Sequence, residues 1–76
     1  MINCKQLRMK SLNRKLGERL KKIRQEKGMS QGDIANKLGV HRSYISGIER
    51  GVRNPTVKNV ERIAEALGVS PHTLLQ

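Results

Sequence analysis

The stretch SQGDIANKLGVHRSYISGIERG, residues 30–51, carries polar side chains where a helix that only packs on a core would need none. Its central residues His41, Arg42, Ser43 and Tyr44 can donate and accept hydrogen bonds. The chain has no nucleophile–base pair, no cluster of metal-ligating residues and no phosphate-cradling glycine loop. These side chains therefore indicate binding rather than catalysis, and we expect no enzyme and no catalytic residue.

The charge of the chain indicates the kind of partner. Its 76 residues include 16 Lys and Arg against 6 Asp and Glu, a net charge of +10. Such a charge attracts DNA, RNA or an acidic membrane surface. Tyr44 is the one aromatic residue, which disfavours single-strand recognition by base stacking. A membrane-bound basic helix over residues 5–27 would need apolar side chains that the core requires. Double-stranded DNA is the expected partner, with a non-specific nucleic-acid or RNA binder as an alternative.

Other ligands find little support in the sequence. Cys4 is the only cysteine, and His41 and His72 lie far apart, so we predict neither a disulfide within the chain nor a zinc site. No apolar run approaches the roughly 20 residues of a membrane span, and the first residues lack the apolar part of a secretory signal. We expect a cytoplasmic protein without cofactor, metal, membrane contact or small-molecule ligand.

Apolar residues recur at helical spacing, which predicts an all-α fold. We expect five helices, which cover about residues 15–27, 31–38, 42–50, 57–67 and 71–75. Each of the first four is followed by a glycine that can end a helix: Gly28, Gly39, Gly51 and Gly68. Ser30 and Asp33 have capping-box spacing, and Thr56 is a candidate cap for the fourth helix.

Residues 1–14 are polar and basic, with scattered apolar side chains. Either a disordered arm or an extension of the first helix fits this composition, and we predict a mostly mobile arm. The arm could add contacts to phosphates or to the minor groove of DNA. The folded domain would then span residues 15–76.

Residues 30–51 also meet the steric demands of two helices that cross at a tight turn. Ala35 is small where the helices would meet, and Gly39 tolerates the positive φ of the turn. The apolar residues that would face the body are Ile34, Leu38, Val40, Ile45 and Ile48. The stretches LKKIRQEKGMSQGDIANKLGV, ISGIERGVRNPT and IAEALGVSPHTLL together resemble the Cro/repressor-type helix-turn-helix family, also called the xenobiotic-response-element family. The resemblance implies a compact five-helix, lambda-repressor-like DNA-binding domain.

The resemblance further implies that the helix beginning near residue 42 enters the major groove. Its candidates for base readout are Arg42, Ser43, Tyr44 and Ser46. Arg42 can offer a bidentate fork to guanine O6 and N7. The hydroxyl of Tyr44 could instead bond a phosphate, or Tyr44 could be a half-buried packing residue. Ser43 and Ser46 could be solvated.

Contacts to phosphates should come from residues around that helix. Gln31 opens the preceding helix, whose N-terminus favours anions, and the family's glutamine at this place typically bonds a phosphate. The other phosphate candidates are His41, Arg50, Arg53, Asn54, Lys22 and Arg19. The resemblance also implies that Arg24 pairs with Glu49, a structural pair because a buried charge needs its partner.

The last segment, GVSPHTLLQ, is apolar for the end of so small a domain. Its leucines could complete the domain's own core, or they could form a two-fold dimer, as family members often do. The interface residues would be Leu67, Val69, His72, Leu74 and Leu75. A two-fold dimer would hold two recognition helices about 34 Å apart and bind an inverted repeat.

These observations lead to one functional prediction: a homodimeric, sequence-specific regulator of transcription that binds double-stranded DNA. The run HRSYISGIERGVRNPT looks most like the controller proteins of restriction–modification systems. An antitoxin-type autorepressor that also binds a toxin protein, or a phage-type repressor, would share much of the pattern. Activation and repression are both open to such a protein.

Overall fold

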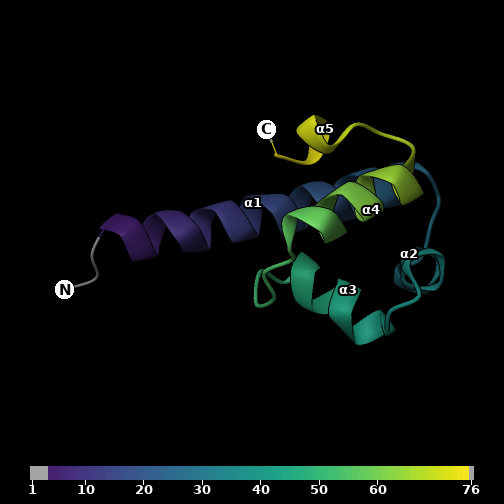
Figure 1. The fold of residues 1–76 in the computed structure, drawn as a ribbon, viewed down its shortest axis with the longest axis horizontal. Coiled ribbons are helices and arrows are strands. Elements are labelled where there is room, and N and C mark those ends of the chain that lie inside the picture. The colour runs from purple at the N-terminus through teal and green to yellow at the C-terminus, as the bar shows by residue number, and fades with distance from the viewer. Residues whose placement is uncertain (1–3, 76) are drawn as a thin grey trace.

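A computed structural model of the chain describes the backbone of residues 4–75 and the side chains of residues 14–75. These residues form five helices and no strand, which confirms the predicted all-α fold (Figure 1). In chain order they are α1 (Cys4–Glu26), α2 (Gln31–Leu38), α3 (Arg42–Glu49), α4 (Val57–Leu67) and α5 (Pro71–Leu75). The bounds of α2 to α5 agree with the predicted ones to within one residue.

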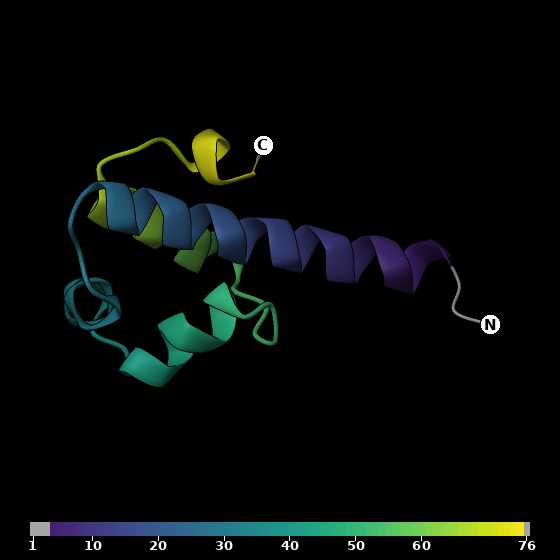
Figure 2. The same ribbon diagram turned by 180° about the vertical axis from the view of Figure 1, so that it is seen from behind.

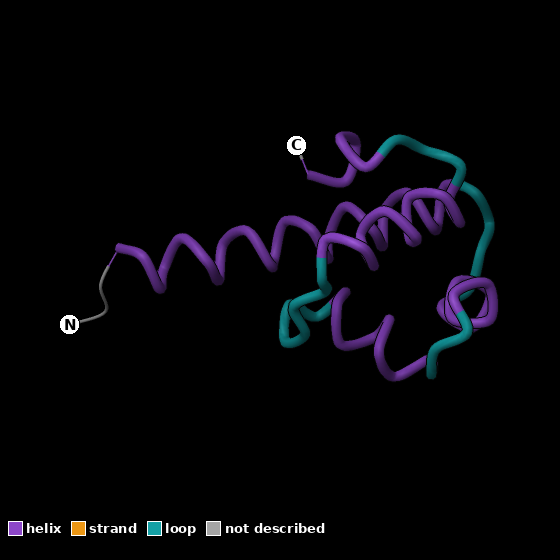
Figure 3. The backbone as a smooth tube through the Cα atoms, viewed as in Figure 1, coloured by secondary structure: helices purple, strands orange, loops and turns teal. Residues whose placement is uncertain are grey.

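The start of α1 differs from the prediction. The helix begins at Cys4 rather than near residue 15, so the described residues 4–14 extend it, which is the other alternative that the sequence left open. The N-terminal half of α1 reaches beyond the other helices (Figure 3). A helical segment outside the core needs no apolar stripe, which is why the sequence pattern did not mark it. The division of the chain into an arm and a domain stays a prediction.

Side-chain hydrogen bonds explain where the short helices begin. Ser30 Oγ accepts from Asp33 N at 3.0 Å, and the Asp33 carboxylate accepts from Ser30 N at 2.8 Å, which is the predicted capping box at the start of α2. Thr56 caps α4 by accepting from Asn59 N at 3.1 Å. The caps satisfy backbone N–H groups that have no partner within the helix.

The helices share one aliphatic core. Its eleven buried side chains are Leu20, Ile34, Ala35, Leu38, Ile45, Ile48, Val60, Ile63, Ala64, Leu67 and Leu74. In Figures 1 and 2, α1 and α4 lie between α5 on one side and the pair α2 and α3 on the other. Because α3 belongs to the outermost layer, one of its sides packs on the body and the other stays open.

Backbone contact fixes the position of α3 against α1. Gly17 lies within α1, and a Cβ at that position would lie 2.3 Å from Ile48 O and 2.8 Å from Glu49 O. Side-chain carbon atoms do not approach backbone oxygen so closely. A glycine is therefore required where α1 passes the last turn of α3.

Candidate nucleic-acid interface

The turn between α2 and α3 presents the first residues of α3 at the surface. Gly39 ends α2 with φ 72°, in the left-handed region that favours glycine, as the sequence predicted. Ala35 is 2% exposed in α2. Arg62 on α4 donates to the carbonyl of Leu38, which has no partner within α2. This hydrogen bond ties the C-terminal end of α2 to α4, and it thereby helps to fix the position at which α3 begins.

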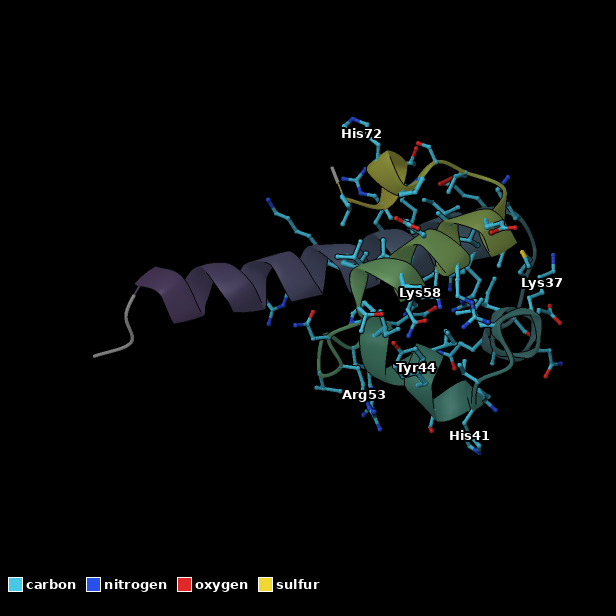
Figure 4. All side chains as sticks on the ribbon, in the orientation of Figure 1. Lys37, His41, Tyr44, Arg53, Lys58 and His72 are labelled. Atoms are coloured by element: carbon cyan, nitrogen blue, oxygen red, sulfur yellow. The ribbon has the colours of Figure 1, made fainter. Side chains whose placement is uncertain are left out.

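One side of α3 is buried and the other is polar. Ile45 and Ile48 pack in the core, and Gly47 is buried beneath the side chain of Arg53. The side chains that remain exposed or half-buried are those assigned to base readout and to the cap: His41, Arg42, Ser43, Tyr44 and Ser46. In Figure 4 the side chains of His41 and Arg53 point away from the body on the side where α3 lies. The predicted recognition residues therefore share an accessible surface.

An ion pair lies behind this surface. Arg24 Nε donates to Glu49 Oε2 at 2.7 Å, and Arg24 Nη2 donates to Glu49 Oε1 at 3.0 Å. The side chains are 11% and 4% exposed, and the remaining donor Nη1 bonds to Met29 O at 2.8 Å. The hydrogen bond to Glu49 raises the pKa of Arg24 above its ordinary value, although burial opposes the shift. The pair that the resemblance implied is present, and it ties α1 to α3.

Gln31 connects this ion pair to the outer side of α3. Its Nε2 donates to Glu49 Oε1 at 3.0 Å, and its Oε1 accepts from Arg42 Nε at 3.4 Å. Arg42 is exposed and borders an open hollow at the N-terminus of α2, which is lined by Arg24, Ser30, Gln31, Gly32 and Arg42. Gln31 thus orients the predicted guanine-binding arginine, while its own contact with a phosphate stays a prediction.

His41 is the N-cap of α3. Its Nδ1 accepts from Ser43 N at 3.1 Å and lies 2.9 Å from Ser43 Oγ. In the neutral ring an accepting Nδ1 leaves the proton on Nε2, so the ring can donate to a phosphate while it caps the helix. The cap and the predicted phosphate contact of His41 are therefore compatible.

Tyr44 is half-buried against the core. Its hydroxyl accepts a hydrogen bond of 2.8 Å from Nδ2 of Asn59 on α4. Arg53 Cζ lies 5.9 Å from the centroid of the ring. This geometry favours the packing alternative for the ring, and base readout by Tyr44 stays a prediction.

The loop after α3 adds positive charge beside the polar side of α3. Arg50, Arg53 and Asn54 are all exposed there, where they were expected to bind phosphates. Arg14 of α1 joins them, because its Cα lies 3.5 Å from where a Cβ on Gly51 would be, and its side chain is exposed. Arg14 could not be assigned to this surface from the sequence, since only the fold brings it to this loop.

Lys22 and Arg19 do not share this surface. A helix turns by about 100° per residue, so these two residues lie about 140° and 160° around α1 from Gly17, which faces α3. They were assigned to phosphates on charge and proximity in the sequence. The structure places them on the side of α1 turned away from α3, which removes the geometric support for that assignment.

The residues assigned to a dimer interface separate into two groups. Leu67 and Leu74 are 2% and 1% exposed and belong to the domain's own core, so they cannot form a surface. Leu75 is 62% exposed, and Val69 is half-buried. His72 points outward from α5, on the opposite side of the molecule from α3 (Figure 4). A subunit contact at α5 would therefore rest on Val69, His72 and Leu75.

Within residues 14–75, whose side chains the structure describes, no group of three or more His, Cys, Asp and Glu side chains is placed to hold a metal ion. None of the described helices is both long and apolar enough to cross a membrane.

Comparison with known proteins identifies the family. A family model described as helix-turn-helix matches residues 20–74. The chain belongs to this helix-turn-helix family. The match covers α2 to α5 and the C-terminal part of α1, and it therefore includes α3 and the loop that follows it.

Two named relatives and one solved structure illustrate the similarity. The HTH-type transcriptional regulator SinR of Bacillus subtilis is 46% identical over 61 residues, which are 79% of this chain and 55% of SinR. The control protein C.BamHI of Bacillus amyloliquefaciens is 48% identical over 60 residues, 78% of this chain and 74% of that protein. The restriction–modification controller C.Esp1396I, solved as a tetramer with its natural 35 base-pair operator, has a TM-score of 0.75 and 49% identity over 83% of each chain.

Several residues that shape this surface could be recognised only from the fold of this helix-turn-helix protein. Asn59 and Arg62 on α4, and Gly17 and Arg14 on α1, all contact residues far away in the sequence. Gly17 carried a weak signal, because an isolated glycine in a helical stretch often marks a close approach. A single asparagine or arginine in a helix carries no such signal.

Proposed function

We propose that this protein is a sequence-specific regulator of transcription that binds double-stranded DNA as a homodimer. α3 lies in the major groove, Arg42 contacts a guanine, and His41 and the residues of the loop after α3 contact phosphates. The protein acts in the cytoplasm, and its activity is binding rather than catalysis.

The observation that carries this proposal is that α3 has one side fixed against the body and one polar side that is open to a ligand. Its inner side is fixed by the core, by Gly17 and by the pair Arg24–Glu49. Its outer side offers Arg42 held by Gln31, on a chain with a net charge of +10. A rigid helix with an oriented guanidinium is suited to base edges, because a side chain held in advance loses less freedom on binding.

The relatives support both the ligand and the role. The controller C.Esp1396I has its operator bound in the solved complex, and it shares 49% identity with this chain. The control protein C.BamHI is 48% identical to this chain over 60 residues. We therefore infer that the chain is a controller of a restriction–modification system.

The homodimer follows from the exposed part of α5. Leu75 is 62% exposed in a domain whose other leucines in α4 and α5, Leu67 and Leu74, are buried. An exposed leucine on α5 gains free energy by packing on its copy across a two-fold axis. The α5 side lies opposite α3, so the dimer leaves both recognition helices free (Figure 1).

Selection of duplexes from a random DNA pool tests the proposal. At about 150 mM salt non-specific affinity is weak, so enrichment reports base contacts. We expect an inverted repeat whose half-sites lie about one turn of DNA apart. A pool that shows no enrichment, together with binding that fades smoothly as salt rises, would contradict specific regulation and leave charge alone as the basis of binding.

A further inference from the structure

Asn59 lies on α4, outside the helix that enters DNA in the proposed complex, yet its amide bonds to a side chain of that helix. Nδ2 of Asn59 donates to Tyr44 Oη at 2.8 Å. Among the side-chain hydrogen bonds in the described part of the chain, this one joins α3 to α4. Asn59 is itself anchored, because its backbone N–H donates to Thr56 Oγ1 at 3.1 Å in the cap of α4.

The direction of this hydrogen bond determines whether the Tyr44 hydroxyl can still donate to a second partner. An amide Nδ2 donates and cannot accept, so the hydroxyl oxygen is the acceptor. The O–H proton of Tyr44 therefore remains available for a second partner. Tyr44 belongs to α3, beside the exposed side of that helix, and a phosphate oxygen is the acceptor that DNA offers most widely.

The ring of Tyr44 in turn lies beside Arg53. The Arg53 guanidinium carbon is 5.9 Å from the ring centroid, within the range of a cation–π contact. The stem of Arg53 lies over Gly47, because a Cβ on Gly47 would come to 2.4 Å from Arg53 Cγ. Arg53 N also donates to Gly47 O at 3.1 Å. The position of Arg53 therefore depends on α3 and on the orientation of Tyr44.

We propose that Asn59 is a positioning residue of the DNA-binding surface, which holds the Tyr44 hydroxyl as a phosphate donor and, through the Tyr44 ring, keeps Arg53 directed toward the same backbone. This inference rests on the proposed function and adds a residue of α4 to its machinery. Asn59 does not itself contact DNA in this arrangement. Tyr44 thereby moves from base readout to phosphate binding.

The test compares Asn59→Ala in two backgrounds, the native chain and Tyr44→Phe, on the duplex enriched from the random pool. We expect Asn59→Ala to weaken binding about three- to tenfold, the range for one hydrogen bond. In the Tyr44→Phe background the same substitution should have almost no further effect, because its partner is gone. Asn36→Ala, an exposed asparagine on α2, serves as the matched control and should bind as the native chain does.

The salt dependence of DNA affinity distinguishes a positioning role of Asn59 from general damage to the fold. The neutral Tyr44 hydroxyl releases no counterion, but loss of the cationic Arg53 contact makes the plot of log affinity against log salt shallower by up to about 0.9. Both substitutions free the Tyr44 ring that holds Arg53. We expect this change in Asn59→Ala and in Tyr44→Phe, with melting temperatures close to the native one. Since Tyr44 is the only aromatic residue, tyrosine fluorescence of the free protein reports the Asn59 bond directly and should differ in Asn59→Ala.

Two results would overturn the inference. One is an equal loss of affinity from Asn59→Ala in both backgrounds, and the other is an unchanged salt slope in Asn59→Ala. Either result, with a native chain that binds the enriched duplex normally, leaves the proposed function standing. A native chain that enriches no duplex would instead contradict the proposed function, and the inference with it.

Discussion

The carboxylate of Glu49 joins three helices. It belongs to α3 and accepts hydrogen bonds from Arg24 on α1 and from Gln31 on α2. Each of these donors would be left without its partner if the carboxylate were removed. The stability of the domain and the orientation of Arg42 therefore depend on the same carboxylate, because Gln31 bonds both to Glu49 Oε1 and to Arg42.

Glu49→Ala should therefore reduce stability before it alters base preference. Breaking a buried pair by removing one partner costs about 3–5 kcal/mol, because the remaining charge stays buried without compensation. Thermal unfolding followed by circular dichroism measures the change. Glu61→Ala, an exposed glutamate on α4, is the control and should melt close to the native chain. An unchanged melting temperature together with an altered base preference in Glu49→Ala would contradict the structural role.

Asp33 makes the stability of the domain depend on pH. Hydrogen bonds from the backbone and side chain of Ser30 lower the pKa of Asp33 below its ordinary value. The folded chain therefore binds this proton less readily than the unfolded chain. The contribution of Asp33 to stability is present above the ordinary pKa of about 3.9, and it is lost as the pH falls through the lower pKa of the folded state.

Asp33→Ala should melt below the native chain at pH 7, and the difference in melting temperature should shrink toward pH 3. A difference that stays constant over this range would argue against the capping box as its source.

The local part of the site could be predicted from the sequence. His41, Arg42 and Ser43 lie at the start of a short helix that the apolar pattern and the glycines delimit, so their exposure followed from spacing. The bond between Tyr44 and Asn59 could not be foreseen, because it depends on how α4 lies against α3. The position of Lys22 could not be foreseen for the same reason: charge in the sequence does not tell which side of α1 faces α3, and its contact with a phosphate stays a prediction.

At the scale of the elements, the contact between α1 and α3 leaves no room for a side chain at Gly17. Gly17→Ala would drive a methyl group into the carbonyl oxygens of Ile48 and Glu49, which are backbone atoms that cannot move aside cheaply. We expect a loss of about 1–3 kcal/mol in the free energy of unfolding, the usual cost of overpacking, although alanine is the better helix former.

Gly32→Ala is the matched control for this prediction. Its Cβ would meet Ser30 Oγ at 3.6 Å, an ordinary contact, so alanine should be neutral or stabilise α2 by up to about 1 kcal/mol. Denaturant unfolding of both variants gives the comparison. Equal effects in the two variants would mean that α1 and α3 do not approach as closely as described.

The helix bounds show which elements a sequence can define. α2 and α4 begin at Ser and Thr caps, and α2 ends at Gly39, all of which are local signals. α1 extends over residues 4–14 beyond the core, where no apolar stripe is required. Its start was therefore predicted about eleven residues too late.

At the scale of the whole molecule, the proposed dimer depends on the end of α5. Leu75→Glu should keep the fold, because this side chain is 62% exposed, but it should abolish the dimer by burying a charge at the subunit contact. Sedimentation of the variant should give a monomer, and its binding to the inverted repeat should lose cooperativity. Leu74→Glu, at 1% exposure, should unfold the domain instead. A Leu75→Glu protein that still sediments as a dimer would place the interface elsewhere.

The central claim is that α3 distinguishes base pairs through Arg42, and the most direct measurement is a specificity ratio. It compares affinity for the enriched duplex with affinity for a scrambled duplex at the same salt, in the native chain, Arg42→Ala and Arg50→Ala. We expect Arg42→Ala to lose about 1–3 kcal/mol on the enriched duplex and far less on the scrambled one. Arg50→Ala, which removes a proposed phosphate contact, should weaken both alike. Equal losses on the two duplexes for Arg42→Ala would contradict base readout by α3.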